Sequence, residues 1–249
     1  TRTSKTFDLV TDDAKNGTKV KGTILLQCLG VMDANGQDIS ENPEMIANMR
    51  KDAKESSNIS NQNNNITAKE EIVNSNNYTS ARIKTQGLKS FQYGRVDVRA
   101  KLPKGKGIWP ALWMLGDNIS SASWPNCGEI DIMEMIGGGV SNEKTIYGTL
   151  HWDDNGSHAS YGGNNSLNSG IFADEFHVFS IIWNSSSIEF LRDDIQYHIA
   201  DITPTQLSEF HQNFFLIFNV AVGGNWPGNP DGTTDFPQSM YVDYIRVFQ

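Results

Sequence analysis

Cysteine, long apolar runs and positive charge are all scarce in this sequence. Its 249 residues include two cysteines, Cys28 and Cys127, which could form one disulfide or both stay free, so no disulfide framework is indicated. No apolar run approaches the roughly 20 residues that cross a bilayer. The formal net charge is −9, and an acidic chain is repelled by phosphate backbones. We therefore expect neither a membrane nor a nucleic acid as a partner.

The beginning of the chain also lacks features. It has no Met and no basic segment followed by an apolar one. We expect a mature or trimmed form from which a signal peptide has been removed, and hence a secreted protein, extracellular or periplasmic.

Aromatic residues are almost absent from residues 1–77. Of the 25 Phe, Trp and Tyr residues, only Phe7 precedes Tyr78. This part predicts one helix over 43–55, because Asn42 can cap it and Pro43 suits the first helical position. The polar run at 57–67 predicts a loop or flexible segment.

From Tyr78 onward the apolar residues recur with period two. In 94-GRVDVRAKL-102 the apolar side chains point one way and the charged ones the other, which is typical of a half-buried strand. Further strands are expected at 108–115, 129–136, 145–152, 177–183, 187–192, 195–200, 213–222 and 240–248. Many short strands separated by turn signals indicate an all-β sandwich or barrel, and 249 residues is an ordinary length for one such domain.

The stretch 128-GEIDIMEMIG-137 places three carboxylates in an apolar strand. Alternate residues share a face, so Glu129 and Asp131 look the same way, while Glu134 would point into the core, where an unpaired carboxylate is costly. One extra residue near Ile132 and Met133, a β-bulge, would return Glu134 to the face of Glu129. The alternative is three solvated acids on an exposed face.

Three acids on one face suit a glycosidase. With a bulge, the Cα atoms of Glu129 and Glu134 would lie about 13 Å apart, and side chains leaning together would leave the carboxyls about 5 Å apart, the spacing of retaining enzymes. Neighbouring negative charge raises a carboxyl pKa, so that one Glu stays protonated while another is ionised.

The segment 124-WPNCGEIDIMEMIG-137 resembles the signature of glycoside hydrolase family 16, in its bulged E-x-D-x-x-E form, and is similar to the laminarinase (endo-β-1,3-glucanase) branch. The resemblance continues in order over roughly two-thirds of the chain, at 78–87, 91–115, 146–152, 219–228 and 241–249. It implies a jelly-roll β-sandwich of two antiparallel sheets with a concave substrate cleft. We expect residues 1–249 to form a single catalytic domain, with 78–249 matching the family and 1–77 atypical.

The resemblance also implies roles for the three acids. Glu129 is similar to the nucleophile, Glu134 to the general acid and then base, and Asp131 to the residue between them that orients and tunes the nucleophile. Catalysis by this mechanism needs no cofactor.

Further residues are candidates for binding sugar. Trp109 and Trp113 share a strand face and could line the cleft or pack in the core, and Trp124 could stack on a sugar. Arg82 could donate to sugar hydroxyls or belong to a solvated face. In the family's GTLHW context, His151 is expected to face the cleft, although a lone His in a strand is more often structural. Two residues of a Gly-rich loop form either a cleft lip or a plain turn: Asn225 and Trp226.

Asp243, on the last expected strand, is similar to an acid that helps to hold a structural calcium ion on the convex side of relatives. Its partners would be backbone oxygens and an acid from the N-terminal part, which is the part that departs from the family pattern.

The leading hypothesis is therefore a secreted, monomeric, retaining endo-glycosidase acting on β-1,3-glucan. Three alternatives stay open. The same mechanism could act on mixed-linkage glucan or on a galactan such as agarose. The chain could be a non-catalytic glucan-binding module, or the glycosyl intermediate could be intercepted by a sugar in transglycosylation.

Overall fold

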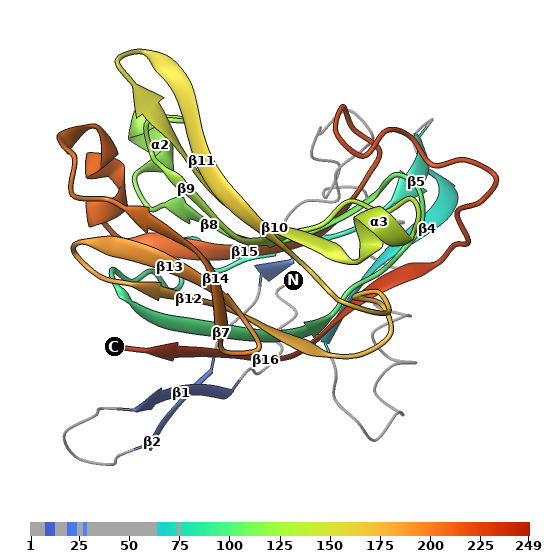
Figure 1. The fold of residues 1–249 in the computed structure, drawn as a ribbon, viewed down its shortest axis with the longest axis horizontal. Coiled ribbons are helices and arrows are strands. Elements are labelled where there is room, and N and C mark those ends of the chain that lie inside the picture. The colour runs from blue at the N-terminus through green and yellow to red at the C-terminus, as the bar shows by residue number, and fades with distance from the viewer. Residues whose placement is uncertain (1–7, 13–18, 24–26, 29–63, 74–75) are drawn as a thin grey trace.

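Two large antiparallel sheets make up most of the computed structural model, which describes residues 8–12, 19–23, 27–28, 64–73 and 76–249. The first sheet has seven strands, in the order β11 (Ser157–Ser166), β10 (Thr145–Asp154), β9 (Glu129–Glu134), β8 (Ile108–Gly116), β15 (Phe214–Val222), β6 (Arg82–Lys84) and β3 (Gln27–Cys28). The second also has seven, in the order β14 (Ile195–Asp201), β13 (Ser187–Arg192), β12 (His177–Trp183), β7 (Gly94–Lys101), β16 (Gln238–Phe248), β4 (Asn64–Val73) and β5 (Asn76–Thr79). The two sheets lie one over the other (Figure 1).

The remaining elements are short. A two-stranded ribbon contains β1 (Asp8–Asp12) and β2 (Lys19–Thr23). Two one-turn helices, α2 (Ile119–Ala122) and α3 (Val140–Glu143), flank β9 along the chain, and a 3₁₀ segment, η1 (Thr205–His211), precedes β15. No helix among the described residues is long and apolar enough to cross a membrane.

The core lies between the two large sheets. On β7, Val96, Val98 and Ala100 are fully buried, and from the facing sheet Leu112 and Met114 are buried against the same cluster. Each such apolar side chain stabilises the fold by about 1.5–3 kcal/mol when it leaves water. The all-β sandwich prediction is thus confirmed, and the alternative of a barrel is wrong.

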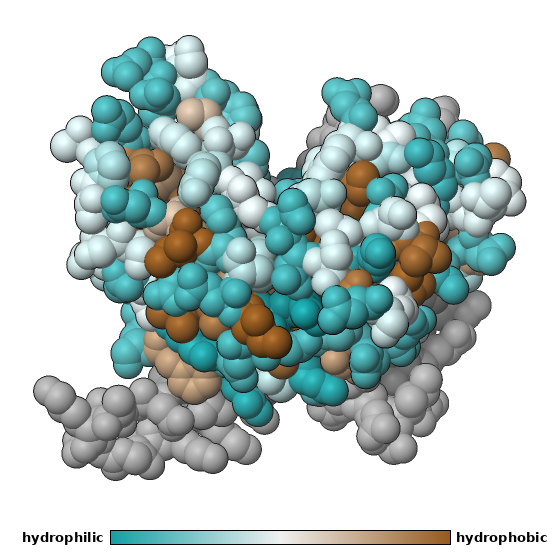
Figure 2. All heavy atoms as spheres, viewed as in Figure 1, coloured by the Kyte–Doolittle hydropathy of each residue, from teal (hydrophilic) through white to brown (hydrophobic). Residues whose placement is uncertain are grey.

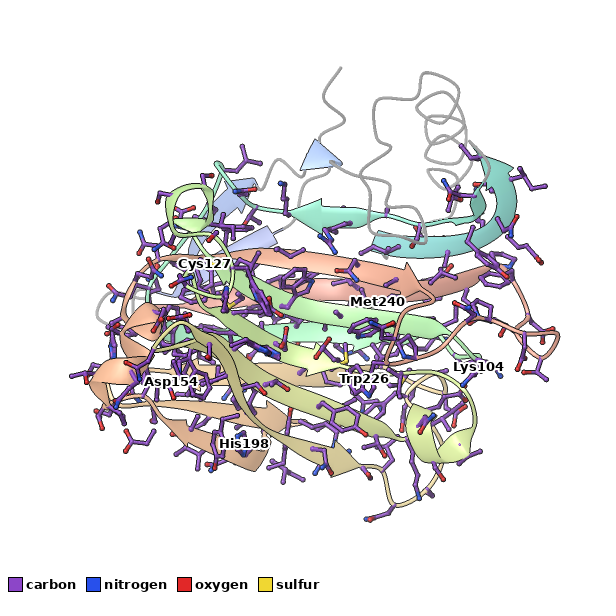
Figure 3. All side chains as sticks on the ribbon, turned by 90° about the horizontal axis from the view of Figure 1, so that it is seen from above. Lys104, Cys127, Asp154, His198, Trp226 and Met240 are labelled. Atoms are coloured by element: carbon purple, nitrogen blue, oxygen red, sulfur yellow. The ribbon has the colours of Figure 1, made fainter. Side chains whose placement is uncertain are left out.

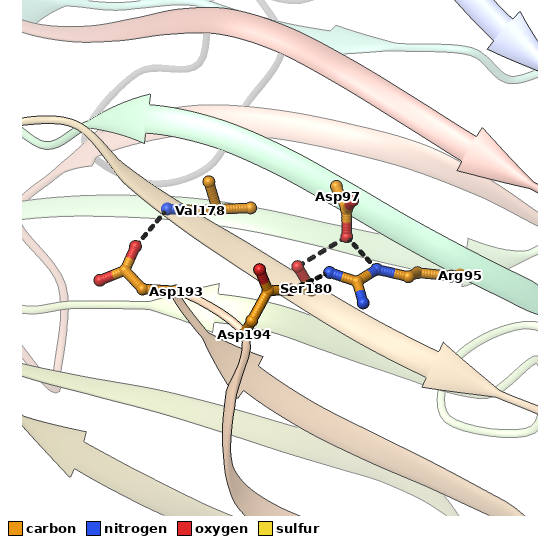
Figure 4. Close-up of polar contacts among 6 residues, drawn as sticks. All are labelled: Arg95, Asp97, Val178, Ser180, Asp193 and Asp194. Carbon is orange, nitrogen blue, oxygen red and sulfur yellow. Dashed lines mark hydrogen bonds and ion pairs between the residues drawn. The ribbon is translucent and has the colours of Figure 1, made fainter.

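The charged face of β7 includes one buried carboxylate. Asp97 is only 8% exposed. It accepts hydrogen bonds from Arg95 Nε at 2.7 Å and from Ser180 Oγ at 2.8 Å. Arg95 also pairs with Asp194 in the β13–β14 turn (Figure 4). A buried carboxylate is stable here because its charge is paired and hydrogen-bonded.

All nine strands expected from the sequence are present, with ends shifted by at most two residues. The polar run expected as a loop through residue 67 is wrong at its end, because β4 begins at Asn64 and pairs with β16. Ile66 supplies the reason, since its side chain is buried in the core. The expected helix over 43–55 lies outside the described residues.

The upper surface of the molecule is hollowed. Figure 2 shows this hollow between one lobe that contains α2 and the tip of β11 and another that contains α3, β4 and β5. The strands β8, β9 and β10 run between the two lobes (Figure 1).

Candidate active site

The bulge in β9 lies where the sequence predicts it. Opposite β8, Met133 pairs with Leu112 but Asp131 already pairs with Trp113, so Ile132 has no partner of its own. The pairing with β10 shifts at the same point. Ile130, Ile132 and Met133 are buried in the core. The extra residue therefore places Glu134 on the same face as the two preceding acids.

Each glutamate on this face accepts a hydrogen bond from an indole. Trp124 Nε1 donates to Glu129 Oε2 at 2.9 Å, and Trp109 Nε1 donates to Glu134 Oε1 at 3.0 Å. Asp131 is only 2% exposed, and its Oδ2 lies 3.1 Å from His151 Nε2. An N–H donor stabilises the ionised form of a carboxyl, so both glutamates can carry charge in spite of their burial.

Burial and mutual repulsion raise the pKa of all three acids. The pKa of Glu129 is raised to about 8 by burial and then by the charge of Asp131. Burial raises the pKa of Glu134 to about 7; the Trp109 hydrogen bond opposes that rise. Burial, followed by the charge of Glu134, raises the pKa of Asp131 well above its ordinary value. The group therefore retains protons near neutral pH.

The pKa of Glu129 is higher than that of Glu134. A nucleophile must be ionised while the general acid keeps its proton, so these roles require the opposite order. The hydrogen bond between the two carboxyls raises the pKa of Glu129 and lowers that of Asp131, whereas the Trp124 N–H lowers the pKa of Glu129. Two hydrogen-bonded carboxyls need one shared proton. Glu129 can react as an anion when that proton lies on the buried Asp131, since the Trp124 N–H stabilises the charge of Glu129.

The expected tryptophans lie at the two ends of the acid face. Trp124, 46% exposed, lies at the Glu129 end, and Trp226, 41% exposed, packs edge-on to Trp109 at the Glu134 end, with ring centroids 5.5 Å apart. In Figure 3, which looks down on the hollowed side, the labelled Cys127 and Trp226 lie toward the two ends of β9. Asn225 is exposed beside Trp226. The structure thus brings these residues to one surface.

Trp113 on β8 and Arg82 on β6 contact each other across β15. The Arg82 guanidinium is 5.2 Å from the centre of the Trp113 ring, and Trp113 Nε1 donates to Asn219 Oδ1 at 2.8 Å. Trp113 is half-buried, whereas Pro110, between it and the other expected cleft residues, is buried. Trp109 and Trp113 thus share the face of β8 that points away from the core.

Three residues of this surface were missed from the sequence. His158 on β11 contacts both His151 and Trp124. Tyr147 on β10 packs against Trp226, with ring centroids 5.1 Å apart. Asn219 is the buried partner of Trp113. Only the tertiary structure joins them to the site, although the Asn155-Gly156 turn signal before His158 could have located β11.

Two sets of residues bear on metal binding. Ligand-type atoms of Glu129, Asp131 and His151 lie within 4.8 Å of one another. Glu129 Oε2 already accepts from the Trp124 N–H, while Asp131 Oδ2 has no hydrogen-bond partner among the described residues. Asp243 Oδ2 accepts from Arg99 Nη1 at 2.6 Å. Because a guanidinium and a cation compete for the same carboxylate, the described residues do not fit calcium well there; the expected N-terminal partner lies outside them.

Two other features lie apart from the acid face. Cys127 is a free, buried thiol directly before β9. A pocket of about 280 Å³ lies on the other side of β10 from His151, and it is lined by Leu150, Trp152, Tyr161, Ala200, Asp201 and Leu207. It contains none of the three acids.

Comparison with known proteins places the chain in a family. Residues 47–246 match the family model described as glycosyl hydrolases family 16. The chain is 40% identical over 187 residues to the clotting factor G alpha subunit of Tachypleus tridentatus, with 74% of this chain and 27% of that protein covered. It is 38% identical over 194 residues to a beta-glucanase of Rhodothermus marinus, covering 74% and 67%. The chain thus spans about a quarter of the length of the clotting factor subunit and about two-thirds of the length of the beta-glucanase.

A solved structure agrees with this assignment. The laminarinase catalytic domain from Thermotoga maritima MSB8 superposes with a TM-score of 0.67 at 46% identity, over 75% of this chain and 77% of that one. The match includes the strand that carries the three acids, since the family model extends across it. The chain therefore belongs to glycosyl hydrolases family 16.

Proposed function

We propose that this protein is a retaining endo-glycosidase that hydrolyses β-1,3-glucosidic bonds of laminarin-type glucans. The observation that carries the proposal is the bulge in β9, which gathers Glu129, Asp131 and Glu134 on one face. Family membership and the similarity to a laminarinase domain support the choice of substrate. Secretion, a monomeric state and one catalytic domain over 1–249 are parts of the same proposal.

The first step forms a glycosyl-enzyme. The ionised Glu129 attacks the anomeric carbon, and the bond from that carbon to the glycosidic oxygen breaks. Glu134 gives its proton to the departing oxygen, which leaves as the hydroxyl of the next sugar. Asp131 keeps its proton on the oxygen nearest Glu129 and so limits the charge of the nucleophile before the attack.

The second step releases the sugar. Glu134, now ionised, takes a proton from a water, whose oxygen attacks the same carbon and displaces Glu129. Two inversions return the anomeric carbon to its original configuration. No redox change and no metal enter this sequence.

Digestion of laminarin tests the proposal. Product anomers followed by NMR in the first minutes should be β, and Glu129→Ser should lose at least 100-fold in rate, because no covalent intermediate can form. The same panel should include mixed-linkage glucan and agarose. Faster hydrolysis of either would move the proposal to that substrate, and equal rates for wild type and variant would refute the mechanism.

A further inference from the structure

The β10–β11 hairpin fixes the position of a histidine that the mechanism above does not use. Its turn residues, Asn155 and Gly156, have φ of 54° and 85°, as a two-residue type I′ turn requires. The resulting register pairs His151 with Ser160, so His158 lies diagonally across from His151 on the cleft face. A slip of one residue would turn His158 to the other face.

His158 contacts two side chains at once. Its Nε2 lies 2.9 Å from His151 Nδ1 in a hydrogen bond, and the two rings are within 20° of coplanar. Its ring also packs on Trp124, with centroids 4.7 Å apart. His151 and Trp124 therefore lie between the imidazole of His158 and the acids.

Both partners of His158 reach the carboxyls. Trp124 donates to Glu129 Oε2 at 2.9 Å, and His151 Nε2 lies 3.1 Å from Asp131 Oδ2. An imidazole that accepts at Nδ1 carries its proton at Nε2. Donation from His158 to His151 Nδ1 would thus direct the His151 N–H toward Asp131.

Burial and the neighbouring His151 favour the neutral form of His158, and they act against the carboxyl groups that face it. The titratable groups that face it are Glu129 and Asp131 on β9, His151 on β10, and Asp153, which is its cross-strand partner. Burial and the neighbouring His151 lower the pKa of His158. A neutral ring keeps one N–H, which is the proton that the hydrogen bond to His151 needs.

Resting on the function proposed above, we propose that His158 is a positioning residue of the active site. It holds the His151 imidazole in one tautomer against Asp131 and the Trp124 indole against Glu129. Its hydrogen bond and its ring contacts are with these two side chains rather than with the acids, so it acts on the acids through them.

The test combines spectroscopy with kinetics on the whole chain. Three variants separate the contacts: His158→Phe keeps a ring against Trp124, His158→Gln keeps a hydrogen-bonding group, and His158→Ala removes both. Ser157→Ala, on the same strand and facing away, is the matched control. Nitrogen NMR of the imidazoles reports the His151 tautomer, and the indole N–H signal of Trp124 reports its bond to Glu129.

We expect the wild type and the control to show a single His151 tautomer. His158→Phe should average the two tautomers, and His158→Ala should in addition move the Trp124 indole signal toward that of a free indole. On laminarin, kcat should fall about 10-fold to 100-fold in His158→Ala with KM within about threefold. His158→Gln should recover part of kcat, and the pH profile should shift in all three variants.

Unchanged NMR signals in His158→Phe and His158→Ala would overturn the proposal, and so would changed signals with unchanged kcat and pH profile. A loss of kcat that follows only the loss of folded protein would also overturn it. If wild type releases no product from laminarin, the proposed function fails, while the tautomer measurement still decides whether His158 holds these residues.

Discussion

Glu129 and Glu134 each accept one indole N–H, but their other neighbours differ. His151 lowers the pKa of both, but Glu129 is hydrogen-bonded to the buried Asp131, whereas Glu134 is affected by the charge of Glu129. An acid that receives a hydrogen bond from a protonated neighbour is easier to ionise. With a proton on Asp131, this difference supports the roles proposed above, with Glu129 as the nucleophile and Glu134 as the proton donor.

Replacing Glu134 by Gln should separate the two chemical steps. On laminarin we expect a loss of about 10²-fold to 10⁴-fold in kcat, because the leaving oxygen receives no proton. On a dinitrophenyl β-glycoside, whose leaving group needs no proton, a burst of dinitrophenol should precede slow turnover. Stopped-flow absorbance measures this burst, and an equal loss on both substrates without a burst would contradict the assignment of Glu134.

Glu134 should also affect how stability depends on pH. Its pKa is about 7 in the folded protein against an ordinary 4.5, so the folded state binds more protons than the unfolded state between these values. Stability contributed by the protonated form is present below pH 4.5 and is lost as the pH rises through 7.

Glu134→Gln removes this titration. At pH 8 we expect the variant to be more stable than wild type by on the order of 1–3 kcal/mol, with the difference vanishing near pH 4. Urea unfolding at pH 4, 6 and 8 measures it, with the exposed Glu175→Gln as control. A constant difference across this range would show that Glu134 is not buried as a neutral acid.

At the scale of elements, the bulge in β9 determines which side chains face the cleft. Deleting Met133 leaves the sequence E-I-D-I-E, in which the three acids alternate regularly and share one face without a bulge. Inserting an Ala after Met133 instead turns Glu134 toward the core when the bulge at Ile132 is kept. Each change alters the strand length by one residue. The Glu134 carboxyl is predicted to face the cleft after the deletion and the core after the insertion.

We therefore expect the deletion to keep activity within about tenfold of wild type, at a cost of about 2–5 kcal/mol in stability from the lost apolar side chain. The insertion should lose as much activity as Glu134→Gln. Laminarin kinetics with urea unfolding compares them. Equal activity in the two variants would show that the facing of Glu134 does not matter.

The sequence was most informative where polarity alternates along one strand. It predicted β7, β8 and the bulged β9, because their faces differ sharply in burial. It did not predict β11, since SHASYGGNNS has no apolar face and the strand is largely exposed at the sheet edge. Likewise β6 has three residues, which is too few for a pattern to be recognised.

The candidate site was also predicted only in part. The sequence spacing identified the three acids, and the family motif identified the tryptophans around them. The partners that hold these tryptophans come from distant strands: Asn219 reaches Trp113 from β15, and His158 reaches Trp124 from β11. Such contacts depend on sheet order, which no local pattern contains.

At the scale of the whole molecule, the acid face has an aromatic side chain at either end. Trp124 lies beside Glu129, and Trp109 and Trp226 lie beside Glu134. The hollow in Figure 2 opens between two lobes. A polysaccharide could therefore lie across the acids with sugar rings on both sides, which is the arrangement that internal cleavage requires.

Shortening Trp226 should weaken substrate binding more than it slows catalysis. Stacking of a ring on an indole contributes about 0.5–1.5 kcal/mol, so Trp226→Ala should raise KM for laminari-oligosaccharides about 3-fold to 10-fold. Its early products should also change in length, as measured by mass spectrometry. Ile199→Ala, an exposed apolar position on β14, should behave as wild type; an equal change in both would argue against a role for Trp226.

Cys127 offers a way to measure local opening of the strand that carries the acids. Its thiol is completely buried and directly precedes the strand that carries the acids, and burial raises its pKa to about 11. Because only the thiolate reacts with disulfide reagents, modification must wait until this strand separates from its neighbours. In a Cys28→Ser background, the rate of thiol modification would then measure how often the catalytic strand separates from its neighbours. A bound oligosaccharide would lower this rate, and more so the more tightly it binds.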